Sequence, residues 1–280
     1  MPGPPGALHL MRCAVIGDPA DHSLSPAIHR AGYTRHCLEW SYEALTVAPR
    51  DLAAFVRPKL HDPEWAGLSV TAPHKEAICQ YGQPDHMASL VGGGNTIVFG
   101  DQPQVYNTDI PGFVRAWRAH GSPRLRSAGI VGNGATARSL LVAMAGLEVR
   151  EVTVLARATH RAAALVELGT ALGITCEVVS LDEPLGGLDL IASTIPPQAT
   201  ASHAAAWAEA AAVLFDVVYD PWPTPLASAA AARGRMALNG LDLLAGQAVD
   251  QFFRFTNTSI TFEAARAAAV AELRRRSVTQ

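Results

Sequence analysis

The chain has 280 residues, a length that is long for one domain and comfortable for two. Hydrophobic residues make up 49% of the composition, which is enough to fill two cores. The formal net charge is −3 and there is no extended basic run, so neither nucleic acid nor an anionic membrane is expected as the main partner. No uncharged apolar stretch reaches the length of a membrane span.

The motifs also argue against secretion and against a metal site. Residues 1–10 lack a basic segment followed by an apolar one, so no secretory signal is expected. The four cysteines form neither a Cys-x-x-Cys pair nor a zinc spacing, and we expect them to be reduced and buried. The ten histidines include no His-Glu-x-x-His motif. We therefore expect a cytoplasmic protein that holds no metal.

The first hundred residues alternate between strand and helix patterns. They predict strands over 13–17, 40–47, 67–70 and 97–99, and helices over 26–37, 50–60 and 74–81. None of the turns between them has a phosphate-binding pattern, which indicates a substrate domain. We expect this domain to span residues 11–110 and to be completed by amphipathic helices within 241–276.

A predicted strand, a glycine turn and a helix then follow one another. Gly132-x-Gly134-x-x-Ala137 has the spacing of the dinucleotide-binding fingerprint. Gly132 would make the turn, Gly134 would let a pyrophosphate approach the backbone, and the helix N-terminus would hold the phosphates. A plain glycine turn is the alternative, but a second strand over 151–155 follows at the distance that a βαβ unit requires. We therefore expect a Rossmann domain over 111–240.

The end of that second strand indicates which dinucleotide binds. NAD sites usually carry Asp or Glu there, which accepts a hydrogen bond from the ribose 2′-hydroxyl. Residues 156–161 contain no carboxylate but include Arg157 and Arg161. Guanidinium groups bind phosphate bidentately and stay charged, so this pattern favours NADP. The alternative is that both arginines only cover the exposed start of a helix.

Polar residues gather at the ends of the predicted strands, where open α/β sheets bind ligands. They are Ser23, Ser25, Thr71, Lys75, Asn95 and Asp109. Several hydroxyls with one lysine and one carboxylate suit a small polyhydroxylated acid, and a lysine near an aspartate suits acid–base chemistry. Each residue also has a purely structural interpretation. Lys75 could be a solvated lysine, Asp109 a helix N-cap, and the two serines turn residues.

An ordered series of motifs over residues 12–275 resembles the shikimate dehydrogenase family. Gly17–His29 resembles the opening G-x-P-x-x-H-S-x-S-P-x-x-H of the family, and Ser69–Lys75 resembles its N-V-T-x-P-x-K segment. The later blocks are Gly94-Asn95-Thr96, Asn107-Thr108-Asp109, Phe215–Tyr219, Thr224-Pro225-Leu226 and Gly240–Ala248.

The resemblance implies two α/β domains, an N-terminal substrate-binding domain and a C-terminal Rossmann domain that binds NADP, with the final helices returning to the first domain. It also implies the reversible reduction of 3-dehydroshikimate to shikimate, with Lys75 and Asp109 as catalytic residues. Residues at substrate-binding positions are Ser23, Ser25, Thr71, Lys75, Asn95, Asp109, Tyr219 and Gln247. Residues at cofactor-binding positions are Gly132, Asn133, Gly134, Ala135, Thr136, Arg157, Arg161, Thr194, Val217 and Gly240.

The sequence departs from the family pattern at a few of these positions. Ser69 stands where many members have Asn, while Ala156 and Ala158 replace the Asn and Thr of an N-R-T run. A quinate/shikimate or aminoshikimate dehydrogenase is the near alternative, although the lack of an acid near Ala156 argues against an NAD-preferring quinate enzyme. A non-catalytic NADP- or shikimate-binding regulator is the distant one. The expected partner is a small molecule, and the chain could act as a monomer or a homodimer.

Overall fold

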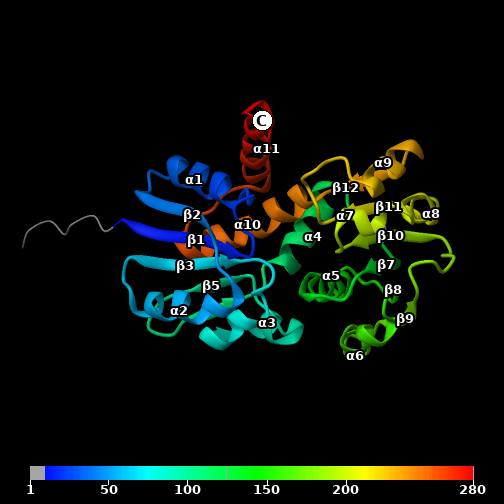
Figure 1. Cartoon of the computed structure of the whole chain (residues 1–280), viewed down its shortest axis with the longest axis horizontal. Helices are drawn as coiled ribbons and strands as arrows, with labels where there is room; N and C mark the ends of the chain where they lie inside the picture. Colours follow the sequence, from blue (N-terminus) through cyan, green and yellow to red (C-terminus); the bar gives the residue numbers. More distant parts are fainter. Residues whose placement is uncertain (1–9, 124, 280) are drawn as a thin grey trace, which may run out of the picture. The chain divides into compact units, whose positions relative to one another are not determined.

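Two separate sheets organise the chain, and each belongs to its own unit (Figure 1). This computed structural model describes residues 10–123 and 125–279. Residues up to Thr108 and from Ala248 onward form unit 1, and Asp109–Gln247 form unit 2. The expectation about a secretory signal falls almost wholly on residues 1–9, outside the described ranges.

Both boundaries between the units involve a helix. Unit 2 begins with α4 (Asp109–Ala119), and it ends inside α10 (Gly240–Thr256), seven residues later than the expected boundary at 240. The first two turns of α10 stay with unit 2 because they pack closely on α4. A Cβ atom on Gly246 would collide with the carbonyl oxygen of Gly112, so the two backbones approach in a way that only glycine permits.

The described part of unit 1 holds one mixed sheet, in the strand order β2-β1-β3-β5-β6-β4. β1 pairs in parallel with β2 and β3, whereas β5 lies antiparallel between β3 and β6. The central β3 is buried along its whole length, which explains its apolar sequence. The strands are β1 Met11–Gly17, β2 Trp40–Thr46, β3 Trp65–Val70, β4 Gln83–Pro84, β5 Thr96–Val98 and β6 Gln104–Tyr106.

Two helices of unit 1 that lie far apart in the sequence, α1 and α11, pack against each other. α1 begins with Pro26 in its first turn, where a missing N–H costs no hydrogen bond, and it packs along α11 (Figure 1). The α-helices are α1 Ser25–Arg35, α2 Leu52–Val56, α3 His86–Val91, the second half of α10 and α11 Phe262–Thr279, with 3₁₀ helices at Pro49–Asp51, Arg57–His61 and Ala77–Tyr81.

Two helices predicted in unit 1 are wrong in extent. The helix expected over 50–60 is a five-residue α-helix between two 3₁₀ turns, because Pro58 cannot donate a backbone hydrogen bond and disfavours helical geometry before it. The helix expected over 74–81 is a turn followed by a 3₁₀ helix from Ala77. β4 and α3 have no counterpart among the elements predicted from the sequence.

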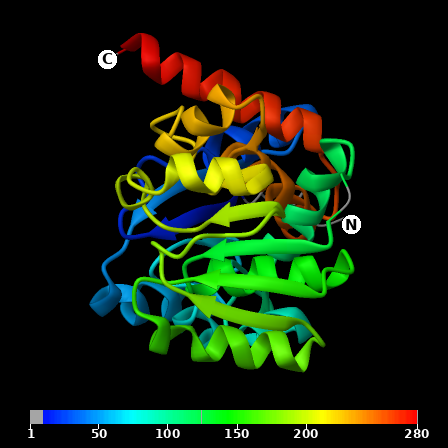
Figure 2. The same cartoon turned by 90° about the vertical axis from the view of Figure 1, so that its right-hand side faces the viewer.

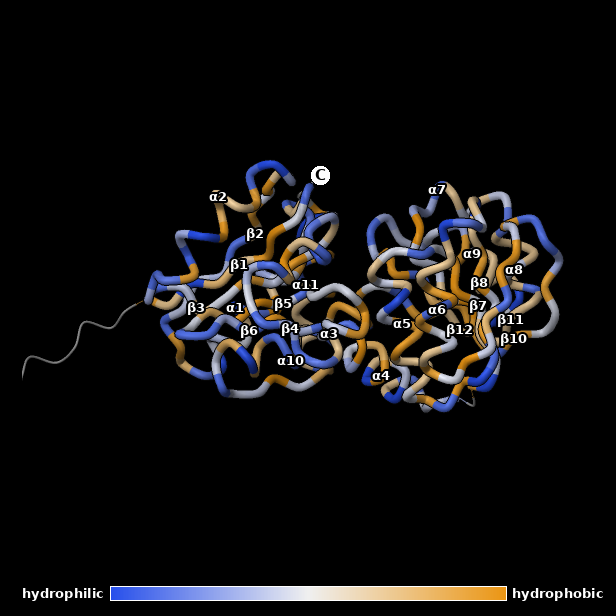
Figure 3. Tube along the Cα trace, turned by 90° about the horizontal axis from the view of Figure 1, so that it is seen from below, coloured by the Kyte–Doolittle hydropathy of each residue, from blue (hydrophilic) through white to orange (hydrophobic). Residues whose placement is uncertain are grey.

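Unit 2 has a parallel sheet in the order β12-β11-β10-β7-β8-β9. When β7 is numbered 1 and the sheet is read from its β9 edge, the order is the 3-2-1-4-5-6 of doubly wound dinucleotide-binding folds. The switch point of this order lies between β7 and β10. Figure 2 shows neighbouring strands running side by side in one direction, and Figure 3 shows hydrophobic residues gathered along them. The strands are β7 Ser127–Val131, β8 Glu151–Leu155, β9 Thr175–Val179, β10 Leu188–Ser193, β11 Ala211–Asp216 and β12 Met236–Leu238.

Helices cover both faces of this sheet (Figure 1). On one face Trp207 is buried against apolar residues of the sheet, among them Ile191 and Leu214. Besides α4 and the start of α10, the helices are α5 Ala135–Gly146, α6 Ala163–Ala171, α7 Pro197–Thr200, α8 Ala204–Ala210 and α9 Pro225–Ala232, with a 3₁₀ helix at Thr159–Ala162. Across the described ranges, no helix combines the length and apolar character that crossing a membrane would require.

The cysteines differ in burial, which corrects the expectation that all four are buried. Cys13 is buried in β1, and burial raises its pKa to about 12. Cys79 and Cys176 are partly buried, and burial also raises their pKa values. Cys37 is exposed in the turn after α1, with a φ angle of 52°.

A buried hydroxyl–carboxylate pair joins β11 to α9 and leads to a stability prediction. Thr224 accepts a hydrogen bond from the backbone N–H of Ala227 as N-cap of α9, and its Oγ1 donates to Asp216 Oδ2 at 2.8 Å. Burial raises the pKa of Asp216, and the hydrogen bond from Thr224 opposes that shift. Thr224→Val keeps the side-chain shape but removes both interactions.

We expect Thr224→Val to lower the free energy of unfolding by about 2 kcal/mol, the sum of a lost cap and a buried hydrogen bond. Thr224→Ser keeps the hydroxyl and serves as the control, with most of the stability retained. Urea unfolding followed by circular dichroism measures both variants. Equal unfolding free energies for Thr224→Val and the wild type would contradict this account.

Candidate functional site

The glycine turn of unit 2 lies at the switch point of its sheet. Gly132 follows β7 with a φ angle of 108°, in the region that favours glycine, and its N–H donates to the carbonyl of Leu155 at the end of β8. A Cβ atom on Gly132 would collide with Thr194 Oγ1, which itself donates to the carbonyl of Val131. The fold therefore requires glycine at this position, and the turn brings Thr194 next to it.

Gly134 is different, because the fold gives no reason for a glycine there. Its φ angle is −79°, and a Cβ atom would meet no heavy atom within 4 Å. Open space therefore lies in front of the first turn of α5, whose leading residues are Ala135 and Thr136. The amides at a helix N-terminus bind phosphate well, so this space fits a pyrophosphate that must approach the backbone closely.

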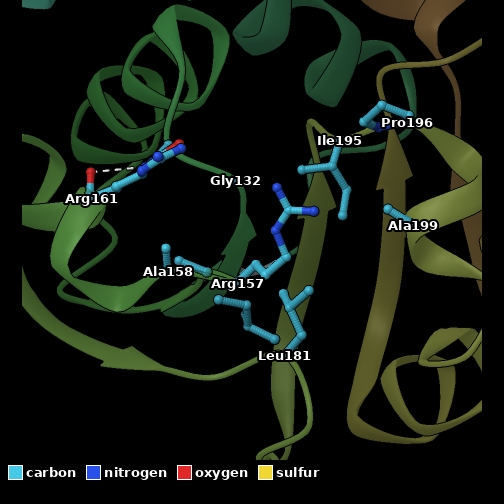
Figure 4. Close-up of a pocket in the computed structure, with 11 residues that line it drawn as sticks. Gly132, Arg157, Ala158, Arg161, Leu181, Ile195, Pro196 and Ala199 are labelled. Atoms are coloured by element: carbon cyan, nitrogen blue, oxygen red, sulfur yellow. Dashed lines mark hydrogen bonds between the residues drawn. The ribbon is translucent and has the colours of Figure 1, made fainter.

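A pocket of about 320 Å³ lies beside this turn (Figure 4). Arg157 extends its side chain into it toward Ile195, and Arg161 also lines it. The side-chain amide of Asn133 donates to the Arg161 carbonyl at 2.8 Å, which ties the glycine turn to the loop after β8 (Figure 4). None of the described lining residues is a carboxylate. Two guanidinium groups without an acid fit a 2′-phosphate, and with it NADP.

The remaining predicted cofactor residues lie after β11. The N–H of Val217 donates to the carbonyl of Ser193, and that of Gly240 donates to the carbonyl of Val218. A Cβ atom on Gly240 would collide with the Val217 carbonyl and would approach the ring of Tyr219 within 3.0 Å. The structure therefore brings Val217, Tyr219 and Gly240 together at the carboxyl end of this strand.

The predicted substrate residues of unit 1 gather at one end of its sheet. Ser23 and Ser25 are buried after β1, and Ser23 Oγ accepts a hydrogen bond from the backbone N–H of Ser25. Thr71 directly follows β3, and its N–H donates to the carbonyl of Ile16 in β1. The carbonyl of Lys75 accepts from the N–H of Gly94, which places the lysine's backbone next to the glycine-rich turn.

Asn95 joins several segments of unit 1. Its side chain is fully buried, and Oδ1 accepts from the Thr108 N–H at 2.8 Å, from Thr108 Oγ1 at 3.0 Å and from Thr96 Oγ1 at 3.1 Å. Its carbonyl accepts from the N–H of Val70 and from the side chain of Gln251. Asn95 therefore fixes the segment that ends at Thr108, one residue before Asp109.

The predicted substrate set is divided between the units. Asp109 is buried as the first residue of α4, and with Tyr219 and Gln247 it belongs to unit 2, whereas the other members belong to unit 1. A Cβ atom on Gly112, one helical turn after Asp109, would lie 2.7 Å from the backbone nitrogen of Gln247. Asp109 and Gln247 are therefore held in register by close contact between α4 and α10.

Tyr42 was not among the predicted site residues, but its hydroxyl lies at the polar end of unit 1, beside Ser69. It is fully buried in β2 and donates to Ser69 Oγ at 2.6 Å, and burial raises its pKa, so the phenol stays neutral. Ser69 is one of the residues that depart from the family pattern. The alternating sequence of β2 identifies Tyr42 as a core residue but carries no sign of this contact. In the described residues, no group of three or more His, Cys, Asp and Glu side chains is placed to hold a metal ion.

Comparison with known proteins decides the family. Residues 15–97 match the family described as the shikimate dehydrogenase substrate binding domain. A Halobacterium salinarum protein named shikimate dehydrogenase (NADP(+)) is 35% identical over 277 residues, covering 92% of this chain and 98% of that protein. The chain belongs to the shikimate dehydrogenase family. The resemblance expected from the motifs is thus confirmed.

Solved structures of this family share the fold. The crystal structure of Mycobacterium tuberculosis shikimate dehydrogenase has a TM-score of 0.85 at 36% identity, covering 93% of this chain and 99% of that one. The shikimate 5-dehydrogenase of Thermus thermophilus, in complex with NADP(H) and shikimate, has a TM-score of 0.82 at 28% identity, covering 94% and 99%. The predicted fold class, two α/β domains, is therefore confirmed.

The contrast between the open glycines of α5 gives a binding prediction. We expect Gly134→Val to weaken NADP binding at least roughly tenfold, because the new side chain would fill the space in front of the helix N-terminus. Gly146→Val is the matched control, since Gly146 also faces open space but lies at the other end of α5. Isothermal titration with NADP measures both, and unchanged affinity in Gly134→Val would exclude this space as the phosphate site.

Proposed function

We propose that this chain is an NADP-dependent shikimate dehydrogenase, an oxidoreductase that reversibly reduces 3-dehydroshikimate to shikimate in aromatic amino-acid (chorismate) biosynthesis. The observation that carries this proposal is the match over 92% of the chain to proteins named shikimate dehydrogenase (NADP(+)). The neighbouring structure that holds NADP(H) and shikimate supports the same pair of ligands. The arginine-lined pocket without a carboxylate supports NADP as the cofactor.

In this proposal Lys75 and Asp109 carry the acid–base chemistry. NADPH, when bound, supplies the hydride that reaches C3 of the substrate. Lys75 donates a proton from Nζ to the C3 oxygen during reduction and takes it back in the reverse direction. Asp109 orients the lysine and holds a substrate hydroxyl.

The other site residues bind and orient the substrate and the cofactor. Ser23 and Ser25 donate hydroxyl hydrogen bonds to the substrate carboxylate, and Thr71, Asn95, Tyr219 and Gln247 hold the carboxylate or the ring hydroxyls. Residues 132–136 hold the pyrophosphate, Arg157 and Arg161 the 2′-phosphate, and Thr194, Val217 and Gly240 the nicotinamide side. Unit 1 is then the substrate domain and unit 2 the NADP domain, with boundaries at 108/109 and 247/248 rather than 110/111 and 240/241.

We also propose a cytoplasmic location, which the four unpaired thiols support because such thiols are typical of a reducing compartment. A monomer and a homodimer are both compatible with this function, and sedimentation velocity distinguishes them.

The first test is substrate and cofactor preference. We expect turnover of shikimate with NADP, followed at the absorbance band of the reduced nicotinamide, with kcat/KM at least roughly tenfold higher for NADP than for NAD, since two arginines and no acid face the 2′-position. Quinate and aminoshikimate are assayed in parallel. A higher kcat/KM with either of them identifies the related dehydrogenases, and binding of shikimate without turnover identifies a regulator.

The second test concerns the lysine. We expect Lys75→Ala to lower kcat by about 10²–10⁴-fold, the range for loss of a general acid, while NADP affinity stays within about twofold. The only other lysine of the chain, Lys59, is the matched control. Its ammonium lies over the Phe55 and Trp65 rings and donates to the Phe55 carbonyl, away from the proposed site residues, so we expect Lys59→Ala to leave kcat unchanged. Near-normal turnover in Lys75→Ala would remove this residue from the mechanism.

A further inference from the structure

We propose that Arg276, in the last turns of the C-terminal helix α11, is a positioning residue for substrate binding. It holds the backbone of the loop that carries Ser23 and leads into Ser25, the first residue of α1. This inference rests on the proposed function, in which these two serines bind the substrate carboxylate. All the residues involved belong to unit 1.

The contacts come from one guanidinium group. Arg276 Nη1 donates to the carbonyl of His22 at 2.9 Å, and Nη2 donates to the carbonyl of Ser23 at 3.1 Å. Its Nε donates to Glu272 Oε1 at 2.8 Å, one helical turn earlier. The planar fork of arginine therefore spans two successive carbonyls of the loop while its third donor is anchored on its own helix.

The negative charge of the Glu272 carboxylate keeps the Arg276 guanidinium group in place. Hydrogen bonds from Arg275 and Arg276 lower the pKa of Glu272 to about 2, so the carboxylate is ionised at any pH at which the enzyme would be assayed. The Glu272 side chain is only 17% exposed, and that of Arg276 is 31% exposed. Hydrogen bonds that are charged and partly shielded from water are stronger than ordinary surface contacts.

The loop is also attached at its start and to the end of β2: the N–H of Asp18 donates to the carbonyl of Ala72, and Thr46 Oγ1 donates to Asp21 Oδ2. The N–H of Ala20 donates to Thr46 Oγ1, and the N–H of Ser23 donates to the Ala20 carbonyl. After Ser23, the Ser25 N–H donates to Ser23 Oγ, and α1 begins. Arg276 thus fixes the carbonyls on both sides of the Ser23 Cα atom, and these determine the direction in which the Ser23 side chain leaves the backbone.

α11 packs along α1, the helix that begins at Ser25 (Figure 1). The C-terminal helix therefore contacts both the helix and the loop that carry the two serines. Loss of the Arg276 fork frees the loop at His22 and Ser23 but leaves this helix packing intact. We therefore expect weaker binding of the substrate carboxylate rather than loss of the fold.

The experiment compares shikimate with its methyl ester, which has no negative carboxylate. In Arg276→Ala we expect KM for shikimate to rise about tenfold with kcat within about twofold, while KM for methyl shikimate and the Kd for NADP stay within about twofold. Arg275→Ala is the matched control, because Arg275 binds the same Glu272 carboxylate through Nε and Nη2, and we expect it to retain wild-type KM. Arg276→Lys keeps the charge but loses the fork and should behave like the alanine variant.

Two results would overturn the inference. One is an unchanged KM for shikimate in Arg276→Ala, and the other is an equal rise in KM for shikimate and methyl shikimate, which would show a merely structural role. If Arg276→Ala does not fold, as judged by circular dichroism, Arg276→Lys is tested with the same two substrates and the same criteria. A wild-type protein that does not turn over shikimate would instead contradict the proposed function, so the two failures are distinguishable.

Discussion

The polar end of unit 1 depends on the hydrogen bonds of Asn95, whose side chain is buried. One amide oxygen accepts three hydrogen bonds, two of them from Thr108, while the backbone of the same residue bonds to β3, to β6 and to Gln251 in α10. Buried polar groups of this kind are costly if left unpaired, so the whole arrangement must form together. Thr108, which this network holds, is the last residue of this part of unit 1 and directly precedes the proposed catalytic Asp109 in the sequence.

In unit 2, the fold requires one glycine of the Gly132-x-Gly134 motif, whereas the other is explained only by a bound ligand. Gly132 is required by the backbone, since its φ angle is positive and a side chain would collide with Thr194. Gly134 has an ordinary conformation and open space in front of it. The two glycines of this motif are thus present for different physical reasons, and Gly134 is the clearer sign of a ligand-binding site. Asn133 lies between them and joins the turn to the arginine-bearing loop.

Local patterns predicted much of this structure. The strand over 151–155, the helix that starts at Ala135 and the alternation of strands and helices all follow from short-range hydrophobic spacing and turn chemistry. Local helix propensity did not predict the segment after Thr71, where a turn and a 3₁₀ helix stand in place of the expected α-helix. The division of the substrate residues between units, and the contacts of Tyr42 and Arg276, link residues far apart in the chain. No local pattern encodes such contacts, and they become visible only when the fold brings the elements together.

The unequal burial of the cysteines gives unit 1 a natural attachment point for a spectroscopic probe. Cys37 is exposed, whereas the other three thiols are held back from the reactive thiolate form by burial. A thiol-specific fluorophore added in limiting amount would therefore mark Cys37 first. That residue lies just beyond the helix that begins at Ser25, so its emission would report on this helix without any engineered cysteine.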